Sequence, residues 1–237
     1  MEIRKLKKFS ESGYAEASFL LGYLYEDEKN NQEMAFQYFE LSHNQGSDLA
    51  SLKLASMLRS GIGCKRSLKN SFELLKSLAI KGIADAQAEL AIYYLEGVGC
   101  KSDRDAYDEW IRKAANQNHV EALEIIADEV SINDEEQAIK LYEKAREHGS
   151  LSATFKLGEK FLESKNKSLF SIERAVAYLR EASDNGNYQA SRRLSEIYRT
   201  GTHDIIPDTE KHKYFYDLAD SQFEAYKNSF KVKASEN

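Results

Sequence analysis

The chain has 237 residues, of which 42% are hydrophobic, 30% are charged and only one is proline, and this balance favours long helices over a β-rich fold. Its formal net charge of −6 argues against sequence-independent nucleic-acid binding, which requires a basic face, and its two cysteines are too few for a disulfide scaffold. We therefore expect no nucleic acid as a partner. No apolar stretch approaches the roughly 20 residues that span a bilayer, and no apolar run follows the basic N-terminus as in a secretory signal. We therefore expect a soluble, cytoplasmic protein without a membrane span.

The N-terminal segment, residues 1–12, is predicted to be a single capping helix. Its Leu6 and Phe9 precede Gly13 at the spacing that marks the second helix of the hairpins described next. The chain therefore begins with half of a repeat, which would cover the apolar face of the first complete one.

From Gly13 onward the sequence repeats itself. A glycine or asparagine recurs at spacings of 33, 36, 36, 31 and 37 residues, at Gly13, Gly46, Gly82, Asn118, Gly149 and Gly186. Periods in this range are typical of stacked helical hairpins. Repeats are therefore predicted at residues 13–45, 46–81, 82–117, 118–148, 149–185 and 186–222 of a single domain spanning residues 1–237.

Each repeat opens with a segment whose apolar residues share one helical face. Four residues after the glycine or asparagine stands an alanine, four residues later a leucine or isoleucine followed by a small residue, and four later a large apolar residue. The recurring leucine or isoleucine is Leu21, Leu54, Leu90, Ile126, Leu157 or Leu194. Apolar residues at i, i+4 and i+8 form one stripe of an α-helix, so this segment is predicted to be the first helix of each hairpin.

The second helix of each repeat is marked at its start, middle and end. Residues able to cap a helix N-terminus stand fifteen positions before the next glycine or asparagine, at Asn31, Ser67, Asp103, Asp134 and Ser171. A large residue follows in each repeat and is expected to fill the space between hairpins: Tyr38, Leu74, Trp110, Leu141, Tyr178 and Tyr214. The glycine then ends the helix in a left-handed conformation at little steric cost.

The last segment, residues 223–237, is predicted to form a separate capping helix and a polar tail. Residues 223–230 carry the apolar spacing of an amphipathic helix, which would cover the sixth repeat.

The third repeat carries a likeness to a known family. Its sequence is AQAELAIYYLEGVG at residues 86–99 and WIRKAA at residues 110–115, and it resembles a Sel-one-like repeat, a relative of the tetratricopeptide repeats. The likeness covers about residues 13–222, although the first, fourth, fifth and sixth repeats lack the Gly-x-Gly link between helices. The resemblance implies an all-α, right-handed solenoid of about six helix-turn-helix repeats that binds other proteins.

Two features that could suggest other chemistry have structural explanations. Gly61–Gly63 and Gly97–Gly99 each follow a predicted helix, whereas phosphate-binding loops follow a strand, so we interpret them as turns. Cys64 and Cys100 occupy the same position in adjacent repeats, about 10 Å apart at the usual helix spacing, which is too far for a disulfide. We therefore expect free thiols.

The sequence shows no signature of an enzyme. It contains neither an HExxH or paired Cys-His pattern for zinc nor a Gly-x-Ser-x-Gly turn. His203, Asp204 and His212 could hold a metal, but a polar loop beside a helix start explains them equally well. Trp110 could anchor a partner, although its place in the repeat favours the core. We expect no catalysis, no cofactor and no metal.

In tetratricopeptide-like solenoids the first helices line the concave surface, and the resemblance implies which positions project into it. Thirty such positions carry eleven acidic and three basic residues, a local balance of −8. The predicted partner-binding residues are Glu16, Phe19, Tyr23, Glu26, Asp27, Asp85, Ile92, Glu96, Glu121, Glu124, Asp128, Phe155, Glu159 and Glu163. The alternative is that these helix faces are charged simply because water covers them.

The sequence thus predicts a monomeric, non-enzymatic scaffold or adaptor whose acidic groove binds a basic or amphipathic segment of a protein partner, with salt-dependent encounter. Two alternatives stay open: a bacterial immunity protein that neutralises a cognate toxin, and a regulator or adaptor in signalling, secretion or host interaction. A homodimer through the end helix is also possible. Charge reversal of Glu121, Glu124 and Asp128 together is expected to abolish capture without unfolding the chain.

Overall fold

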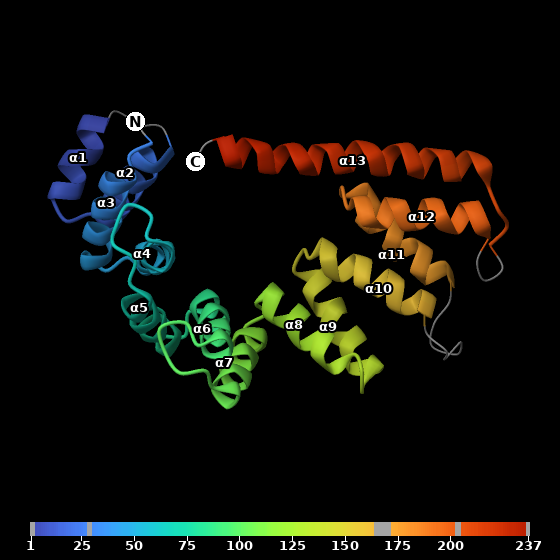
Figure 1. Cartoon of the computed structure of the whole chain (residues 1–237), viewed down its shortest axis with the longest axis horizontal. Helices are drawn as coiled ribbons and strands as arrows, with labels where there is room; N and C mark the ends of the chain where they lie inside the picture. Colours follow the sequence, from blue (N-terminus) through green and yellow to red (C-terminus); the bar gives the residue numbers. More distant parts are fainter. Residues whose placement is uncertain (1–2, 28–29, 164–171, 202–204, 236–237) are drawn as a thin grey trace. The chain divides into compact units, whose positions relative to one another are not determined.

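The computed structural model describes residues 3–27, 30–163, 172–201 and 205–235, and the regular elements in these ranges are α-helices (Figure 1). They are α1 Ile3–Glu11, α2 Ala15–Asp27, α3 Gln32–Asn44, α4 Asp48–Ser60, α5 Leu68–Ile80, α6 Ala84–Glu96, α7 Arg104–Asn116, α8 Val120–Val130, α9 Glu135–Glu147, α10 Leu151–Glu163, α11 Ile172–Asp184, α12 Tyr188–Thr200 and α13 Thr209–Ser235. The helices that pack most extensively on one another are neighbours in the sequence. Such packing defines a solenoid, so the predicted fold class, an all-α solenoid of about six helical hairpins, is confirmed.

The chain divides into two compact units, residues 1–122 and 123–237, with the boundary inside α8. Hairpins of a solenoid contact only their neighbours, so such a chain can divide into compact units without any break in the succession of repeats. The single domain over residues 1–237 stays a prediction.

Within each hairpin the recurring large–small pair of the first helix packs against the second helix. The buried leucines at the large position are Leu21, Leu54, Leu90, Leu157 and Leu194, while Ile126 is half-buried. A Cβ atom added to Gly22 would lie 2.5 Å from Cε1 of Phe39, and one added to Gly158 would lie 2.7 Å from Cγ of Leu179. The small residues therefore allow the two helices to approach closely.

The most deeply buried large residue of each second helix directly follows the large residue that was expected to fill the space between hairpins. The predicted residues are half-buried in five repeats, and Tyr214 is exposed. The residues that follow them are buried: Phe39, Leu75, Ile111, Tyr142, Leu179 and Phe215. Because both positions carry large side chains and the apolar face of a helix is wide enough for both, the pattern did not distinguish them.

Trp110 is half-buried and packs against the core cluster that contains Leu75 and Leu90. The ammonium of Lys113 lies 4.0 Å from the centre of its ring. The indole therefore covers the joint between the second and third repeats, as a core role requires.

The predicted N-caps of the second helices are confirmed within the described residues. Asn31, Ser67, Asp103 and Asp134 each accept a hydrogen bond from the backbone N–H three residues ahead. Ser171 lies outside the described residues. The caps stop the free backbone donors at each helix start from being left unpaired.

The first helices have caps of their own, which the sequence analysis missed. Ser47 and Asn187 accept the backbone N–H three residues ahead, and Ser150 does the same for Ala153. In the fourth repeat the cap is Nδ1 of His119, which accepts from the N–H of Ala122. All four follow directly after the glycine or asparagine that separates repeats, so their place in the sequence is the signal that identifies them.

The Gly-x-Gly segments are turns between helices, as interpreted from the sequence. Gly61 and Gly97 end α4 and α6 with positive φ angles of 78° and 73°. The second glycine of each segment lies against the preceding repeat: a Cβ atom on Gly63 would be 2.1 Å from the carbonyl oxygen of Gln32, and one on Gly99 would be 2.2 Å from that of Leu68. These links therefore fix one hairpin onto the start of the previous second helix.

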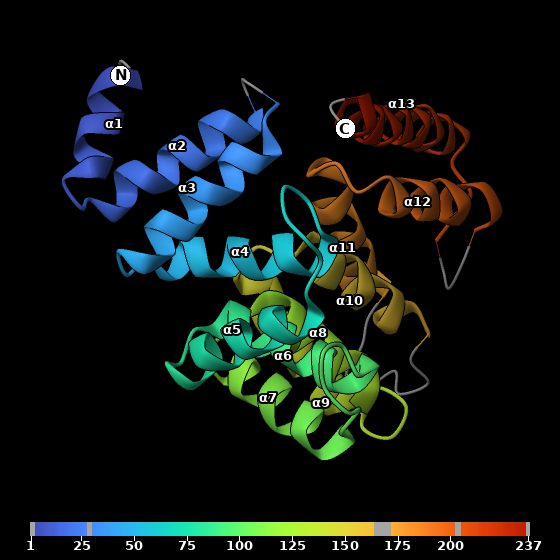
Figure 2. The same ribbon diagram turned by 60° about the vertical axis from the view of Figure 1, so that its left-hand side comes forward.

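The prediction of a separate capping helix from residue 223 is wrong. Instead, α13 runs without a break from Thr209 to Ser235 alongside α12 (Figures 1 and 2). Position 222, eight residues after Tyr214, is Gln222, whereas the five earlier repeats carry a glycine or asparagine there that ends the second helix. The ring of the next residue, Phe223, packs on Tyr188 of α12, with ring centres 5.0 Å apart. One helix therefore serves both as the second helix of the sixth repeat and as the C-terminal cap.

Candidate functional site

Ion pairs join the first helices of unit one. Nζ of Lys53 in α4 lies 2.8 Å from Oε2 of Glu26 in α2. Nη2 of Arg59, one turn and a half further along α4, lies 3.3 Å from Oε2 of Glu96 in α6. We call the surface that these pairs connect the first-helix face of unit one. It carries the predicted binding residues Glu16, Phe19, Tyr23, Glu26, Asp27, Asp85, Ile92, Glu96 and Glu121.

An aromatic cluster lies on α2 within this face. Phe19 and Tyr23 pack edge to face with ring centres 4.9 Å apart, and both contact the ring of Phe39 beneath them. Lys53 lies over the Tyr23 ring at 5.2 Å. Tyr23 nevertheless keeps 38% of its surface exposed, so the cluster offers an apolar contact to a partner.

Two carboxylates of α2 carry no counter-charge. Glu16 in the first turn and Asp27 at the end of the helix are exposed, and neither pairs with a lysine, arginine or histidine in the part of the chain that the structure describes. They flank the aromatic cluster along the helix. The first-helix face of unit one therefore combines exposed aromatic surface with unneutralised negative charge.

His119 lies close to the carboxylates of two further predicted binding residues, Asp85 and Glu121. Its Nε2 lies 3.2 Å from Oδ1 of Asp85, and its Nδ1 lies 3.5 Å from Oε2 of Glu121. Because Nδ1 accepts the N–H of Ala122, it carries no proton to share with Glu121 in this arrangement. The Nε2–H group can donate to Asp85, while Glu121 stays exposed without a hydrogen-bonded cation.

Glu124 and Asp128 in α8 are bound within unit two. Ser152 donates to Glu124 at 2.6 Å, and Lys156 of α10 lies 2.7 Å from Oδ2 of Asp128. The hydroxyl of Tyr142 in α9 donates to Asp128, and burial together with this bond raises the pKa of Tyr142. These two carboxylates thus connect three helices of the unit.

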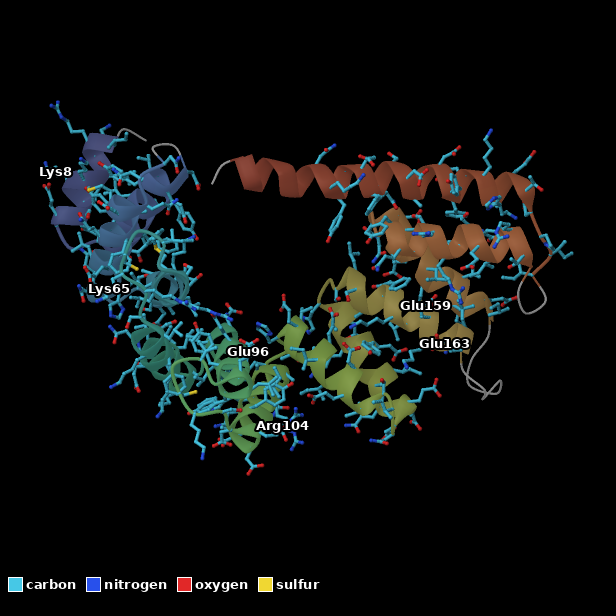
Figure 3. The ribbon with its side chains drawn as sticks, in the orientation of Figure 1. Lys8, Lys65, Glu96, Arg104, Glu159 and Glu163 are labelled. Atoms are coloured by element: carbon cyan, nitrogen blue, oxygen red, sulfur yellow. The ribbon has the colours of Figure 1, made fainter. Side chains whose placement is uncertain are left out.

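Of the two predicted acidic residues of α10, one forms an ion pair and the other does not. Glu159 and Glu163 lie one turn apart (Figure 3). Nε of Arg193 in α12 lies 2.9 Å from Glu159, and burial raises the pKa of this carboxyl although Arg193 acts in the opposite direction. Glu163 is exposed and has no ion pair among the residues described, and Phe155 is half-buried.

The acidic excess predicted for the groove positions is partly neutralised by basic residues just outside them. Lys53, Lys156 and Arg193 stand one position before the recurring leucine, a position that is not one of the thirty expected to project into the groove. Each reaches back to a carboxylate of the preceding first helix. Among the predicted binding residues that the structure describes, Glu16, Asp27 and Glu163 have no ion pair, and Glu121 has only His119 nearby.

This arrangement changes the expected result of charge reversal. Glu124→Lys with Asp128→Lys should lower the free energy of unfolding by about 1–2 kcal/mol, because the change removes bonds to Ser152, Tyr142 and Lys156 and brings like charges together. Glu121→Lys should stay within about 0.5 kcal/mol of the parent. Urea denaturation followed by circular dichroism measures both, and equal stabilities for the two variants would show that these bonds do not hold the helices.

The described residues contain no group of three histidine, cysteine or acidic side chains able to hold a metal ion; His203 and Asp204 lie outside them. Cys64 and Cys100 are free thiols that donate to the carbonyl oxygens of Met57 and Tyr93, and burial raises the pKa of both. A raised pKa lowers the fraction of reactive thiolate. No described helix is both long enough and apolar enough to cross a membrane.

These observations define an α-helical repeat protein built from stacked hairpins. The chain belongs to the Sel1 repeat family: the family model matches residues 15–47, 49–83, 84–119, 129–150, 152–187 and 189–219. The resemblance seen in the sequence is thereby confirmed. Sel1 repeats are generally non-enzymatic scaffolds that mediate protein–protein interaction.

Two solved structures similar to this chain share its fold, and a curated protein is similar to it in sequence. A Sel1 repeat protein from Oxalobacter formigenes matches with a TM-score of 0.77 at 19% identity, covering 93% of this chain and 99% of that one. The immunity protein PA5088 from Pseudomonas aeruginosa gives 0.57 at 17% identity, covering 81% and 74%. Chitin synthase regulatory factor 3 from Schizosaccharomyces pombe is 23% identical over 81% of this chain and 22% of its own length. The chain spans less than half the length of the curated relatives it matches.

Proposed function

We propose that the protein is a non-enzymatic scaffold that, as a monomer, binds a basic or amphipathic segment of another protein on the first-helix face of unit one. One observation carries this proposal: the exposed Glu16 and Asp27 flank the Phe19–Tyr23 pair without a cation of their own. A segment with lysine or arginine beside an apolar residue would satisfy both features at once.

The same chemistry sets the expected strength of binding. Exposed charges attract a basic segment over a distance but contribute little each once contact is made, because water screens them. The aromatic pair supplies apolar area, which salt does not weaken. Binding should therefore lose association rate as salt rises while retaining a salt-resistant part.

The test compares two triple charge reversals within unit one. The test variant carries Glu16→Lys, Asp27→Lys and Glu121→Lys. The control carries Glu11→Lys, Glu33→Lys and Asp105→Lys, which lie on second helices at comparable places: two in a first turn and one at a helix end. Both variants change the net charge equally.

Affinity capture from an extract of the source cells, followed by mass spectrometry at low and high salt, gives the readout. We expect partners that are captured by the parent and by the control and lost with the test variant, with capture reduced at high salt by roughly tenfold or more. Partners retained equally by both variants would contradict the proposal, provided that circular dichroism shows both to be folded.

A second candidate function is neutralisation of a toxin. Its specific support is the shared fold with the immunity protein PA5088. Co-expression with the products of neighbouring genes tests it: an immunity protein should co-purify with one of them and suppress its toxicity. Absence of any such complex would leave the general scaffold function, including a regulatory role in signalling, secretion or host interaction, as the explanation.

A further inference from the structure

Unit one contains a cleft of about 560 Å³ between α3 and α5, which are the second helices of the first and second repeats. The first helix of the second repeat, α4, lies between them in the sequence and forms the floor with Leu54 and Leu58. Its walls are second helices, and the α4 residues of its floor, Leu54 and Leu58, are not among the residues of the first-helix face.

The walls of the cleft pair an apolar residue with a carboxylate on each side. Phe36 and Glu40 stand one turn apart on α3, and Glu73 and Leu74 are adjacent on α5. Phe36 and Leu74 are half-buried and pack against the core cluster around Leu54, whereas both carboxylates are exposed. The cleft thus has an apolar base and two carboxylates at its rim, while His43, which also lines it, is hydrogen-bonded through Nδ1 to Ser51.

Neither rim carboxylate is neutralised by the protein. Glu40 and Glu73 lie on facing helices, and neither forms an ion pair with any lysine, arginine or histidine of the described chain. Two like charges across one opening repel each other, and a hydrogen-bond donor carrying positive charge between them would relieve that repulsion. The complementary occupant is therefore a cation with an apolar stem.

The next joint of the same unit shows that this cleft is not a general property of the repeat. At the corresponding positions between α5 and α7, Lys76 replaces Glu40, Glu109 replaces Glu73 and the larger Trp110 replaces Leu74. Lys113 pairs with Glu109 at 2.5 Å and lies 4.0 Å from the Trp110 ring. There the charge is balanced and a bulky side chain occupies the joint.

We propose that the cleft between α3 and α5 binds the side chain of an arginine from a protein partner. The planar guanidinium carries five N–H donors in a fixed fork, so it can donate to Glu40 and Glu73 together. Its aliphatic stem packs on Leu58 and Leu74, and its flat face stacks against Phe36. A lysine ammonium, a compact charge, matches two separated carboxylates less well.

The test is a titration of the whole ¹⁵N-labelled chain with N-acetyl-arginine amide, followed by backbone amide shifts in NMR spectra. The shifts should concentrate on α3, α4 and α5. N-acetyl-citrulline amide, which has the same shape without the charge, should cause none there, and N-acetyl-lysine amide should bind more weakly by about threefold or more.

Three variants separate charge from shape. Glu40→Gln with Glu73→Gln should weaken arginine binding by about tenfold or more. Leu74→Trp copies the third repeat and should block the cleft while both carboxylates remain. Glu33→Gln with Asp105→Asn removes two exposed carboxylates outside the cleft and should leave the shifts unchanged.

Equal shifts with citrulline amide or lysine amide, or shifts that persist in the Glu40/Glu73 double variant, would overturn the assignment, as would absence of shifts on α3 to α5 at the highest soluble concentration of the arginine probe. None of these outcomes depends on the first-helix face. The arginine cleft and the proposed scaffold surface can therefore fail independently.

Discussion

Replacing Gly99 by alanine is expected to lower the free energy of unfolding by about 3 kcal/mol or more, one of the largest losses available from a single methyl group in this chain. The added Cβ would lie 2.2 Å from the carbonyl oxygen of Leu68, and the backbone at Gly99 has a φ of +69° that L-residues rarely adopt. The atom it meets is backbone at the start of α5, so no side-chain rotation can relieve the clash. Gly63→Ala should behave alike, since its Cβ would lie 2.1 Å from the carbonyl oxygen of Gln32.

Gly82→Ala is the matched control. Its φ is +93°, yet nothing lies within 4 Å of the added Cβ atom. It should therefore cost only the left-handed backbone strain, about 1–2 kcal/mol. Urea denaturation at 25 °C measures all three variants, and a Gly99→Ala loss no greater than that of Gly82→Ala would show that the contact with the preceding repeat is not rigid.

Replacing Gln45 by leucine is expected to cost about 2–3 kcal/mol, because it leaves buried polar groups without their partner. The Gln45 amide nitrogen donates to the carbonyl of Ser10 at 2.9 Å, and its amide oxygen accepts from the Ser18 hydroxyl at 2.6 Å. The hydroxyls of Ser10 and Ser18 in turn lie 2.7 Å apart, and both serines are buried. One side chain thus connects α1, α2 and the end of α3.

The same three-residue network recurs in unit two, where it can be tested independently. Gln222 donates to the carbonyl of Ser183 at 2.7 Å and accepts from Ser191 at 2.6 Å, while the two serine hydroxyls lie 2.7 Å apart. Gln222→Leu should therefore lose as much stability as Gln45→Leu.

Two further variants control for the change of side chain. Gln37→Leu on the exposed side of α3 should change stability by no more than about 0.5 kcal/mol. Adding Ser10→Ala and Ser18→Ala together to Gln45→Leu should recover part of the loss, since the pair removes both buried hydroxyls of the broken network. If all glutamine variants matched Gln37→Leu, the buried network would contribute nothing to stability.

The sequence predicted the fold because its signals repeat. The alanine, the leucine or isoleucine, and the glycine or asparagine recur in every repeat, because each position meets the same steric constraint in every hairpin. The polar network was missed because its members are ordinary serines and glutamines, and it is complete only where both types coincide. The break before residue 223 was predicted from the repeat length, although the residue that would make the break is absent there.

The candidate site could be predicted only in part. Helical periodicity placed Glu16 and Asp27 on an exposed face, but it could not show that Lys156 reaches across to Asp128. Pairing between successive first helices depends on side-chain reach and rotamer, which a one-dimensional pattern does not contain. The cleft between α3 and α5 could not be predicted for a related reason: it arises from residues that differ between repeats, whereas the periodic pattern contains only what the repeats share.

Gly63 and Gly99, the second glycines of the two Gly-x-Gly turns, affect how unit one unfolds locally. Because each packs closely against the first carbonyl group of an earlier helix, a hairpin that opens must disturb the hairpin before it. Amide hydrogen–deuterium exchange across α3 to α6 should then occur as one cooperative event, with matching protection factors, instead of fraying helix by helix.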